Sequence, residues 1–156
     1  IGIRLKFRIT QVEVVSYTKI WIHLIWSTKC RYPYLTKPAR YLIFKHMQCI
    51  GREKGIEINF INGYEDHVHL LIFLKPTQNI SHIVRQVKGE SSNWINKNRI
   101  IKSKFNWQRE YIALSVGRNE VKRIRNYIRN QEEHHSKRNY NEEVKNLSAG
   151  ELSHTG

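Results

Sequence analysis

The sequence predicts an α+β fold of the ferredoxin-like type, an antiparallel sheet with a split βαβ arrangement and one helix added at its C-terminal end. Two observations predict this class. The expected elements follow the order strand, helix, strand, strand, helix, strand, and 156 residues suffice for one domain with a proper core. We place that domain at residues 17–135, after an N-terminal extension of residues 1–16 without an assigned role and before a polar tail of residues 136–156.

The first strand is expected at residues 19–27, KIWIHLIWS, a run rich in β-branched and aromatic residues. The first helix follows it, because Thr36 with Pro38 two positions later is typical of a helix start. Its apolar residues recur at helical spacing as far as Gly51 or Gly55, namely Ala39, Leu42, Ile43, Met47 and Ile50.

An antiparallel hairpin is expected at the centre of the sheet. Ile56, Ile58 and Phe60 alternate with polar residues, which is the pattern of a strand with one buried face. The short turn NGYED then leads directly into DHVHLLIFL, residues 66–74. Because a connection this short joins neighbouring antiparallel strands, the two segments should pair with each other.

The second strand of this hairpin carries two histidines on one face. Successive side chains of a strand point to opposite faces, so His67 and His69 share one face. The other face, packed against the two helices of the split βαβ unit, should hold Val68, Leu70, Ile72 and Leu74. Leu71 and Phe73 lie on the histidine face, so that face must also be partly covered, by a third helix or by a second subunit.

The second helix follows Pro76 and continues to about Asn96, despite Gly89 in its middle. Its helical spacing is defined by Ile80, Ile83, Val84, Val87, Trp94 and Ile95. A basic loop, NRIIKSKFN, separates it from the fourth strand at residues 111–116, which Gly117 ends.

A third helix is expected at residues 119–135, where one stripe contains Val121, Ile124, Ile128 and Gln131. Beyond Ser136 the chain is polar, and we expect it to be loose.

The charge balance predicts a polyanionic partner. Lys and Arg number 27 against 13 Asp and Glu, so the formal charge is +14, and the aromatic residues are spread among the basic ones. Nucleic acid is the partner that this composition favours, although a merely basic soluble protein has the same balance. Basic side chains around the second and third helices could each neutralise a phosphate, above all Arg85, Lys88, Lys97, Arg123 and Arg129. Trp94 and Trp107 could stack on splayed bases.

The two cysteines, Cys30 and Cys49, lie in neither a CxxC nor a zinc-finger spacing, so we expect no disulfide framework and no zinc finger. No apolar run approaches the length of a membrane span, and no signal-peptide pattern opens the chain. These features predict a cytoplasmic protein.

Two histidines separated by one residue on a strand have Cα atoms about 6.5–7 Å apart, which suits two ligands of one divalent ion. The pattern alone is weak, since His67 and His69 could equally be two hydrogen-bonded histidines. Tyr127 and Gln131 are four residues apart, so on a helix they share a face, and the amide oxygen of Gln131 could complete the metal site. Tyr127 could instead be a core aromatic.

Four segments in this order carry a family resemblance: DHVHLL on a strand, VKGESSNWIN on a helix, FNWQREYIALSVG, and YIRNQEEHH on a late helix. Together they resemble the single-tyrosine HUH transposases, the TnpA proteins of small hairpin-ended bacterial insertion sequences and their relatives associated with repeated extragenic palindromes. The resemblance covers about residues 17–140.

The resemblance implies roles for four residues. His67 and His69 match the histidine pair that holds Mg²⁺ or Mn²⁺, Gln131 matches the third protein ligand, and Tyr127, on the added helix, matches the nucleophile. It further implies that the protein binds hairpins in single-stranded DNA at element ends, cleaves through a 5′-phosphotyrosine and rejoins strands without ATP. The chain has no GxxxxGK[ST] nucleotide-binding loop, in agreement with that chemistry.

The family also implies a homodimer in the bacterial or archaeal cytoplasm, associated with the nucleoid. Whether the tyrosine helix would serve its own subunit or the other one is left open by the sequence. Three alternatives remain: a domesticated relative that processes chromosomal palindromes, a replication initiator with the same chemistry, and a non-catalytic ferredoxin-like nucleic-acid-binding module. The last lacks support, because the strands carry no RNP-type aromatic motif.

Overall fold

The computed structural model describes residues 16–150, and within them it has a four-stranded antiparallel sheet of order β2-β3-β1-β4. This order confirms the ferredoxin-like class, because the hairpin strands β2 and β3 form one half of the sheet and the first and last strands, β1 and β4, form the other half. The strands are β1 (Ile20–Ser27), β2 (Glu57–Gly63), β3 (His67–Leu74) and β4 (Ile112–Val116). The N-terminal extension lies almost wholly outside the described residues.

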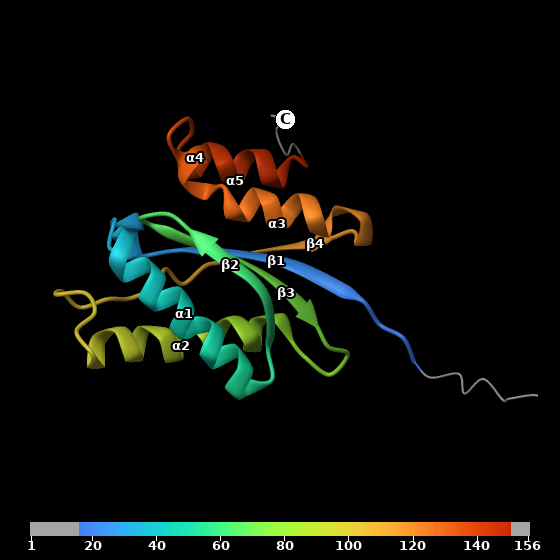
Figure 1. The fold of residues 1–156 in the computed structure, drawn as a ribbon, viewed down its shortest axis with the longest axis horizontal. Helices are drawn as coiled ribbons and strands as arrows, with labels where there is room; N and C mark the ends of the chain where they lie inside the picture. Colours follow the sequence, from blue (N-terminus) through green and yellow to red (C-terminus); the bar gives the residue numbers. More distant parts are fainter. Residues whose placement is uncertain (1–15, 151–156) are drawn as a thin grey trace, which may run out of the picture.

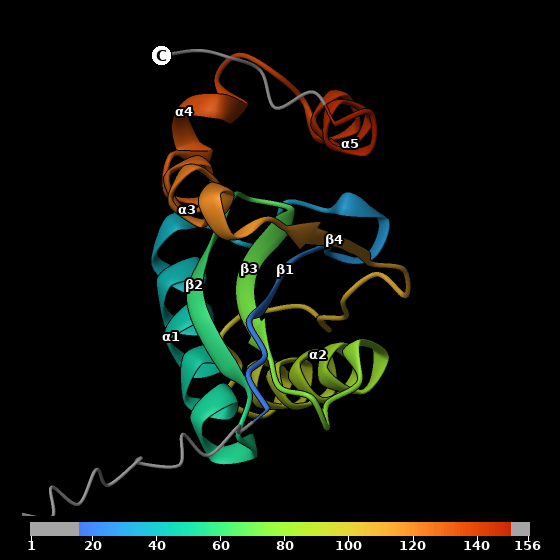
Figure 2. The same ribbon diagram turned by 90° about the vertical axis from the view of Figure 1, so that its right-hand side faces the viewer.

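Helices cover both faces of the sheet, as Figures 1 and 2 show. One face carries α1 (Lys37–Lys54) and α2 (Ile80–Lys97). The other face carries α3 (Val121–Arg129), α4 (Gln131–His135) and α5 (Tyr140–Ser148). Two short 3₁₀ turns, Lys29–Arg31 and Arg118–Glu120, follow β1 and β4. Within residues 16–150, no helix combines the length and apolar character that crossing a bilayer requires.

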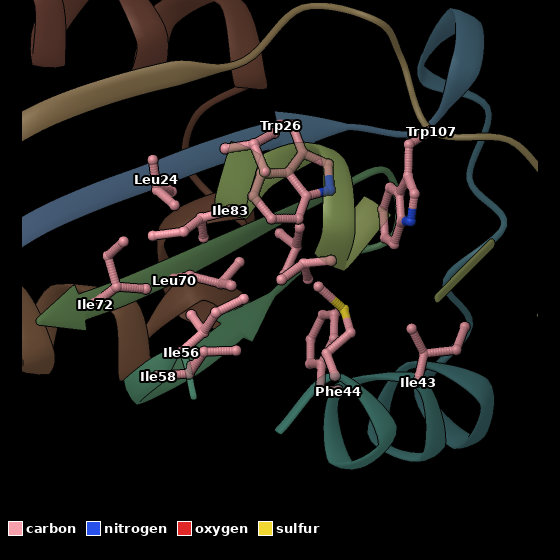
Figure 3. Packing of buried hydrophobic residues seen from close by; sticks show 14 of the residues in the cluster. Leu24, Trp26, Ile43, Phe44, Ile56, Ile58, Leu70, Ile72, Ile83 and Trp107 are labelled. Atoms are coloured by element: carbon pink, nitrogen blue, oxygen red, sulfur yellow. The ribbon is translucent and has the colours of Figure 1, made fainter. Parts of the chain in front are cut away.

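The larger hydrophobic core lies between the sheet and helices α1 and α2 (Figure 3). As the strand alternation predicted, Val68, Leu70 and Ile72 of β3 are fully buried in it. They pack with Leu24 and Trp26 of β1, and with apolar residues of both helices such as Ile43, Phe44, Ile83 and Val87. Burial of this apolar surface is the main source of the stability of the domain.

Trp107 belongs to this core, which contradicts the suggestion that it stacks on bases. Its side chain is buried, and the indole Nε1 donates a hydrogen bond to Ser91 Oγ at 2.8 Å. Ser91 Oγ donates in turn to the carbonyl of Val87 at 2.6 Å, so a polar chain links the 98–111 loop to α2. Trp94 is half-buried and stacks on the ring of His46, with ring centroids 4.0 Å apart.

A second, smaller core lies on the histidine face. It consists of Leu71, Val116, Ile124 and Ile128, so α3 provides the cover that Leu71 required. Of the two covers considered, the third helix is therefore the one that the structure contains.

The third predicted helix is divided into α3 and α4, which corrects the expectation of one helix over residues 119–135. The break lies at Asn130, and its cause is a contact from another element. The side-chain amide of Asn62 on β2 donates to the carbonyls of Ile128 and Arg129, both at 3.0 Å. Because these carbonyls bond to Asn62, the helical ladder is interrupted there.

The expectation that the chain is loose beyond Ser136 is also wrong, because residues 140–148 form α5. Asn139 caps this helix by accepting from the backbone N–H of Glu142, while the side chain of Glu142 accepts from the backbone N–H of Asn139. This capping box satisfies two backbone donors at the helix start. Leu147 is buried, so α5 also has an apolar anchor.

Two glycines within helices give opposite predictions for stability. A Cβ on Gly51 of α1 would lie 2.9 Å from the carbonyl oxygen of Ile56 and 3.0 Å from Ile58 Cδ1, whereas a Cβ on Gly89 of α2 would meet nothing within 4 Å. Gly51→Ala should therefore lower the free energy of unfolding by about 1–3 kcal/mol. Gly89→Ala should raise it by up to about 1 kcal/mol through helix propensity.

Urea unfolding followed by circular dichroism measures both changes. A Gly51→Ala variant as stable as the wild type would mean that α1 does not approach β2 as closely as described.

Candidate active site

The two histidines of β3 lie side by side under the α3 to α5 layer. His67 and His69 have no exposed surface, and their ring centroids are 5.0 Å apart with the rings nearly perpendicular. Fully buried imidazoles need polar partners, because an unpaired buried nitrogen is costly. The partners of each ring therefore indicate which ring nitrogens carry a proton and which have a lone pair free to bind a ligand.

The position of the proton on His67 follows from its contact with Asp66. His67 Nδ1 lies 2.7 Å from Asp66 Oδ1, and Arg31 forms an ion pair with the same carboxylate at 3.3 Å. Burial would raise the pKa of Asp66, but the hydrogen bond from His67 and the charge of Arg31 outweigh it and hold that pKa below its ordinary value. Since a carboxylate only accepts, Nδ1 carries the proton, and in the neutral ring Nε2 has a free lone pair.

That lone pair faces another acceptor. Gln131 Oε1 lies 3.2 Å from His67 Nε2, while the amide nitrogen of Gln131 donates elsewhere, to Glu143 Oε1 at 3.2 Å and to the carbonyl of Tyr127 at 3.4 Å. Two acceptors this close, both buried, are arranged as ligands of a cation would be.

His69 is oriented by a third histidine that the sequence did not reveal as a site residue. His69 Nδ1 shares a hydrogen bond of 2.9 Å with Nε2 of His23 on β1, and the two rings stack. Burial lowers the pKa of His69. Burial and neighbouring His69 lower the pKa of His23 to about 3, so this ring is neutral. Within the described part of the chain, His69 Nε2 makes no hydrogen bond and points into the site.

Tyr127 lies beside these rings in the same chain. Its ring centroid is 5.9 Å from that of His69 and 6.2 Å from that of His23. The ring packs against the second core, as the core interpretation expected, but the hydroxyl reaches into the polar site and donates to Glu143. Burial and the negative charge of Glu143 raise the pKa of Tyr127 far above its ordinary value.

Glu143 of α5 is the central residue of the site, and no sequence pattern pointed to it. Its side chain is buried and accepts hydrogen bonds from Tyr127 and Gln131 through Oε1 and one from His135 through Oε2 at 3.0 Å. Burial would raise its pKa, but the neighbouring imidazoles of His69 and His135 lower it below its ordinary value, so the group is a carboxylate.

The predicted DNA-contacting residues are not gathered on one surface. On α2, Arg85 and Lys88 line a hollow of about 380 Å³ together with Arg109, and Lys97 is exposed near the end of the helix. On the opposite face of the sheet, Arg123 and Arg129 are exposed on α3. Arg123 pairs with Glu120, and the guanidinium of Arg129 lies 5.5 Å from the ring centroid of Phe60.

Comparison with known proteins identifies the class, since solved structures that share this fold are transposases. A putative transposase of Deinococcus radiodurans superposes with a TM-score of 0.61 at 27% identity, over 74% of this chain and 93% of that one. A REP-associated tyrosine transposase bound to a REP hairpin shares the fold with a TM-score of 0.58 at 18% identity, over 78% of this chain and 72% of that one. The fold is thus one that transposases have.

The family follows from the sequence pattern. Residues 16–131 match the family described as "Transposase IS200 like", and the chain belongs to that family. The ISDra2 transposase TnpA of Deinococcus radiodurans is 29% identical over 115 residues, which cover 70% of this chain and 81% of the relative.

The contact of Asn62 with the end of α3 can be tested through stability. Asn62→Ala removes the donor to two carbonyls and should lower the free energy of unfolding by about 1–2 kcal/mol. Asn59→Ala is the matched control on the same strand: its exposed side chain accepts only from Arg125, so the change should stay within about 0.5 kcal/mol. Urea unfolding compares the two variants, and equal effects would contradict the role given to Asn62.

Proposed function

We propose that this transposase binds hairpins in single-stranded DNA at element ends, cleaves beside them through a bond between Tyr127 and a 5′-phosphate, and rejoins strands. The observation that carries the proposal is that Tyr127 lies in the same chain beside the two buried histidines: its ring centroid is 5.9 Å from that of His69, and its hydroxyl donates to Glu143, whose carboxylate lies within 3.5 Å of Nε2 of both His67 and His69. The relative bound to a REP hairpin supports hairpin DNA as the substrate class.

A divalent cation, Mg²⁺ or Mn²⁺, fits the residues present. His67 Nε2 and Gln131 Oε1 are acceptors that face each other at 3.2 Å, and the buried His69 Nε2 has no hydrogen bond among residues 16–150. Nitrogen and oxygen atoms of these types are ligands of Mn²⁺ and, for the oxygen, of Mg²⁺. His67, His69 and Gln131 would hold the ion. When bound, it would neutralise charge on the scissile phosphate and make phosphorus more electrophilic.

The chain itself supplies the nucleophile and its position. A free tyrosine has a pKa near 10, so forming phenolate at pH 7 costs roughly 4 kcal/mol. In this site burial and Glu143 raise the pKa of Tyr127 further, so the phenol is protonated before substrate binds. The Tyr127 oxygen forms the new bond to phosphorus, the bond to the 3′-oxygen breaks, and the proton lost by the phenol balances the one gained by the new 3′-hydroxyl.

The joining step reverses the same exchange. The phosphotyrosine keeps the energy of the original phosphodiester, so the 3′-hydroxyl of another strand can displace Tyr127 and restore a phosphodiester without ATP. The absence of a GxxxxGK[ST] loop from the sequence is compatible with this chemistry.

Of the two arrangements that the sequence left open, the proximity of Tyr127 to its own His69 and His23 supports a site completed within one subunit. A homodimer stays a prediction. Among the proposed phosphate contacts, Arg123 and Arg129 share α3 with Tyr127 and are the best placed to hold DNA near the nucleophile. Arg85 and Lys88 would act from the hollow on the other face.

Tyr127→Phe should abolish the covalent product and leave hairpin binding nearly intact, because it removes only the nucleophilic oxygen. The measurement incubates purified protein with labelled single-stranded hairpin DNA and Mg²⁺ or EDTA, and resolves the products on a denaturing protein gel. Tyr41→Phe, a change on the exposed face of α1, is the matched control and should retain the Mg²⁺-dependent label. A labelled Tyr127→Phe protein would rule out this nucleophile. Binding by the wild type with no covalent species would instead favour the non-catalytic binding module.

His23→Leu should weaken Mn²⁺ binding about 10- to 100-fold. Leucine fills the space of the imidazole but removes the hydrogen bond that orients His69, and residues that orient metal ligands typically contribute this much. Calorimetric titration with Mn²⁺ provides the comparison. The control is His46→Leu, which removes a half-buried histidine stacked on Trp94 and away from the site; equal affinities of the two variants would remove His23 from the metal site.

A further inference from the structure

Helix α5 is attached to the site at its first turn. Arg31, which pairs with Asp66, also donates to Asn141 Oδ1 at 2.8 Å, and its guanidinium lies 4.8 Å from the ring centroid of Tyr140. The Tyr140 ring lies in turn 5.0 Å from the ring of His67. These contacts hold the start of α5 against the histidine strand, and as a result Glu143, one turn later, points into the site.

The carboxylate of Glu143 lies among the atoms assigned as metal ligands. Its Oε1 is 3.3 Å from His69 Nε2, and its Oε2 is 3.5 Å from His67 Nε2. Two ligands each about 2.1 Å from one ion, at octahedral or tetrahedral angles, lie about 3.0–3.4 Å apart. The 3.3 Å separation lies within this range and the 3.5 Å separation lies just above it, so small shifts would let these donor atoms share an ion.

The hydrogen bonds of the site leave acceptor atoms that face one another with no donor between them, and a cation would bind them. Because Asp66 takes the Nδ1 proton, the lone pair of His67 Nε2 faces the oxygens of both Gln131 and Glu143, and no proton lies between them in the neutral ring. His135 Nε2, which donates to Glu143 Oε2, lies beside these acceptors, within 4.8 Å of ligand-type atoms of His67 and Glu143. Converging acceptors of this kind repel one another until a positive charge joins them.

Charge balance favours the same assignment. His67, His69 and Gln131 contribute no negative charge, so a doubly charged ion bound by them alone would be buried without a counter-charge. Glu143 supplies one negative charge and a carboxylate oxygen, the ligand type that Mg²⁺ and Mn²⁺ prefer.

We propose that Glu143 of α5 is a fourth protein ligand of the divalent cation, adding a carboxylate to His67, His69 and Gln131. The proposal rests on the metal site of the proposed function. In this role α5 is part of the active site, and the carboxylate that binds the ion also accepts the hydrogen bond from Tyr127. With the ion and substrate bound, this hydrogen bond would hold Tyr127 beside the scissile phosphate.

Mn²⁺ binding tests the proposal without reference to activity. The full chain is stripped of metal with EDTA, and free Mn²⁺ is followed by its electron paramagnetic resonance signal during titration. Glu143→Gln has the same shape but no charge and should weaken Mn²⁺ binding by at least about tenfold. Glu142→Gln is the matched control on the same helix: it is exposed, its amide can maintain the capping box, and its affinity should stay within about twofold of wild type.

The outcomes separate this proposal from the metal site itself. A wild type that binds no Mn²⁺ refutes both. Wild-type binding that is lost in His69→Ala but unchanged in Glu143→Gln overturns the ligand role alone. Should Glu143→Gln also cleave hairpin DNA faster, Glu143 would instead occupy the place of the scissile phosphate. Urea unfolding checks that the variant is folded, and Glu143→Ala provides the same comparison if the amide variant is not.

Discussion

The alternation of side chains along β3 is the constraint on which the rest of the structure depends. This strand is buried on both faces, so each side chain of its first half packs either into the main core or into the polar site on the opposite face. Val68 and Leu70 belong to the main core, and His67 and His69 belong to the polar site on the other face. A shift of one residue would place imidazoles among apolar side chains and valine among the ligands, so the register of β3 and the chemistry of the site are inseparable.

The buried polar cluster also shows how a domain can tolerate ionisable groups in its interior. His23 and His69 are neutral because burial lowers the pKa of each. Asp66 and Glu143 stay ionised because histidine and arginine partners compensate for burial. The neutral histidines thus have hydrogen-bond partners, and the carboxylates have histidine or arginine partners. The acceptor atoms of these side chains converge on one small volume.

The strands and the first two helices could be predicted because their signals are local: alternation, helical spacing and end-capping residues. The features that could not be predicted depend on contacts between distant segments. The break at Asn130 requires Asn62 on another strand, and His23 becomes a site residue only through the pairing that places it opposite Leu71. The capping box of α5 is visible in the sequence, but nothing local indicates that Glu143 lies beside two histidines some seventy residues earlier.

The manner in which α5 is held has a consequence for how the domain folds. This helix has nine residues, and only Glu143 and Leu147 are buried in it. A helix this short is not stable by itself, and it adds little apolar burial to either core. The sheet and the other helices can therefore form without α5, and undocking of this helix is expected to cost less free energy than global unfolding. The free energy of global unfolding and the fraction of molecules with α5 docked are accordingly separate quantities. A mutation can change one of them and leave the other unchanged.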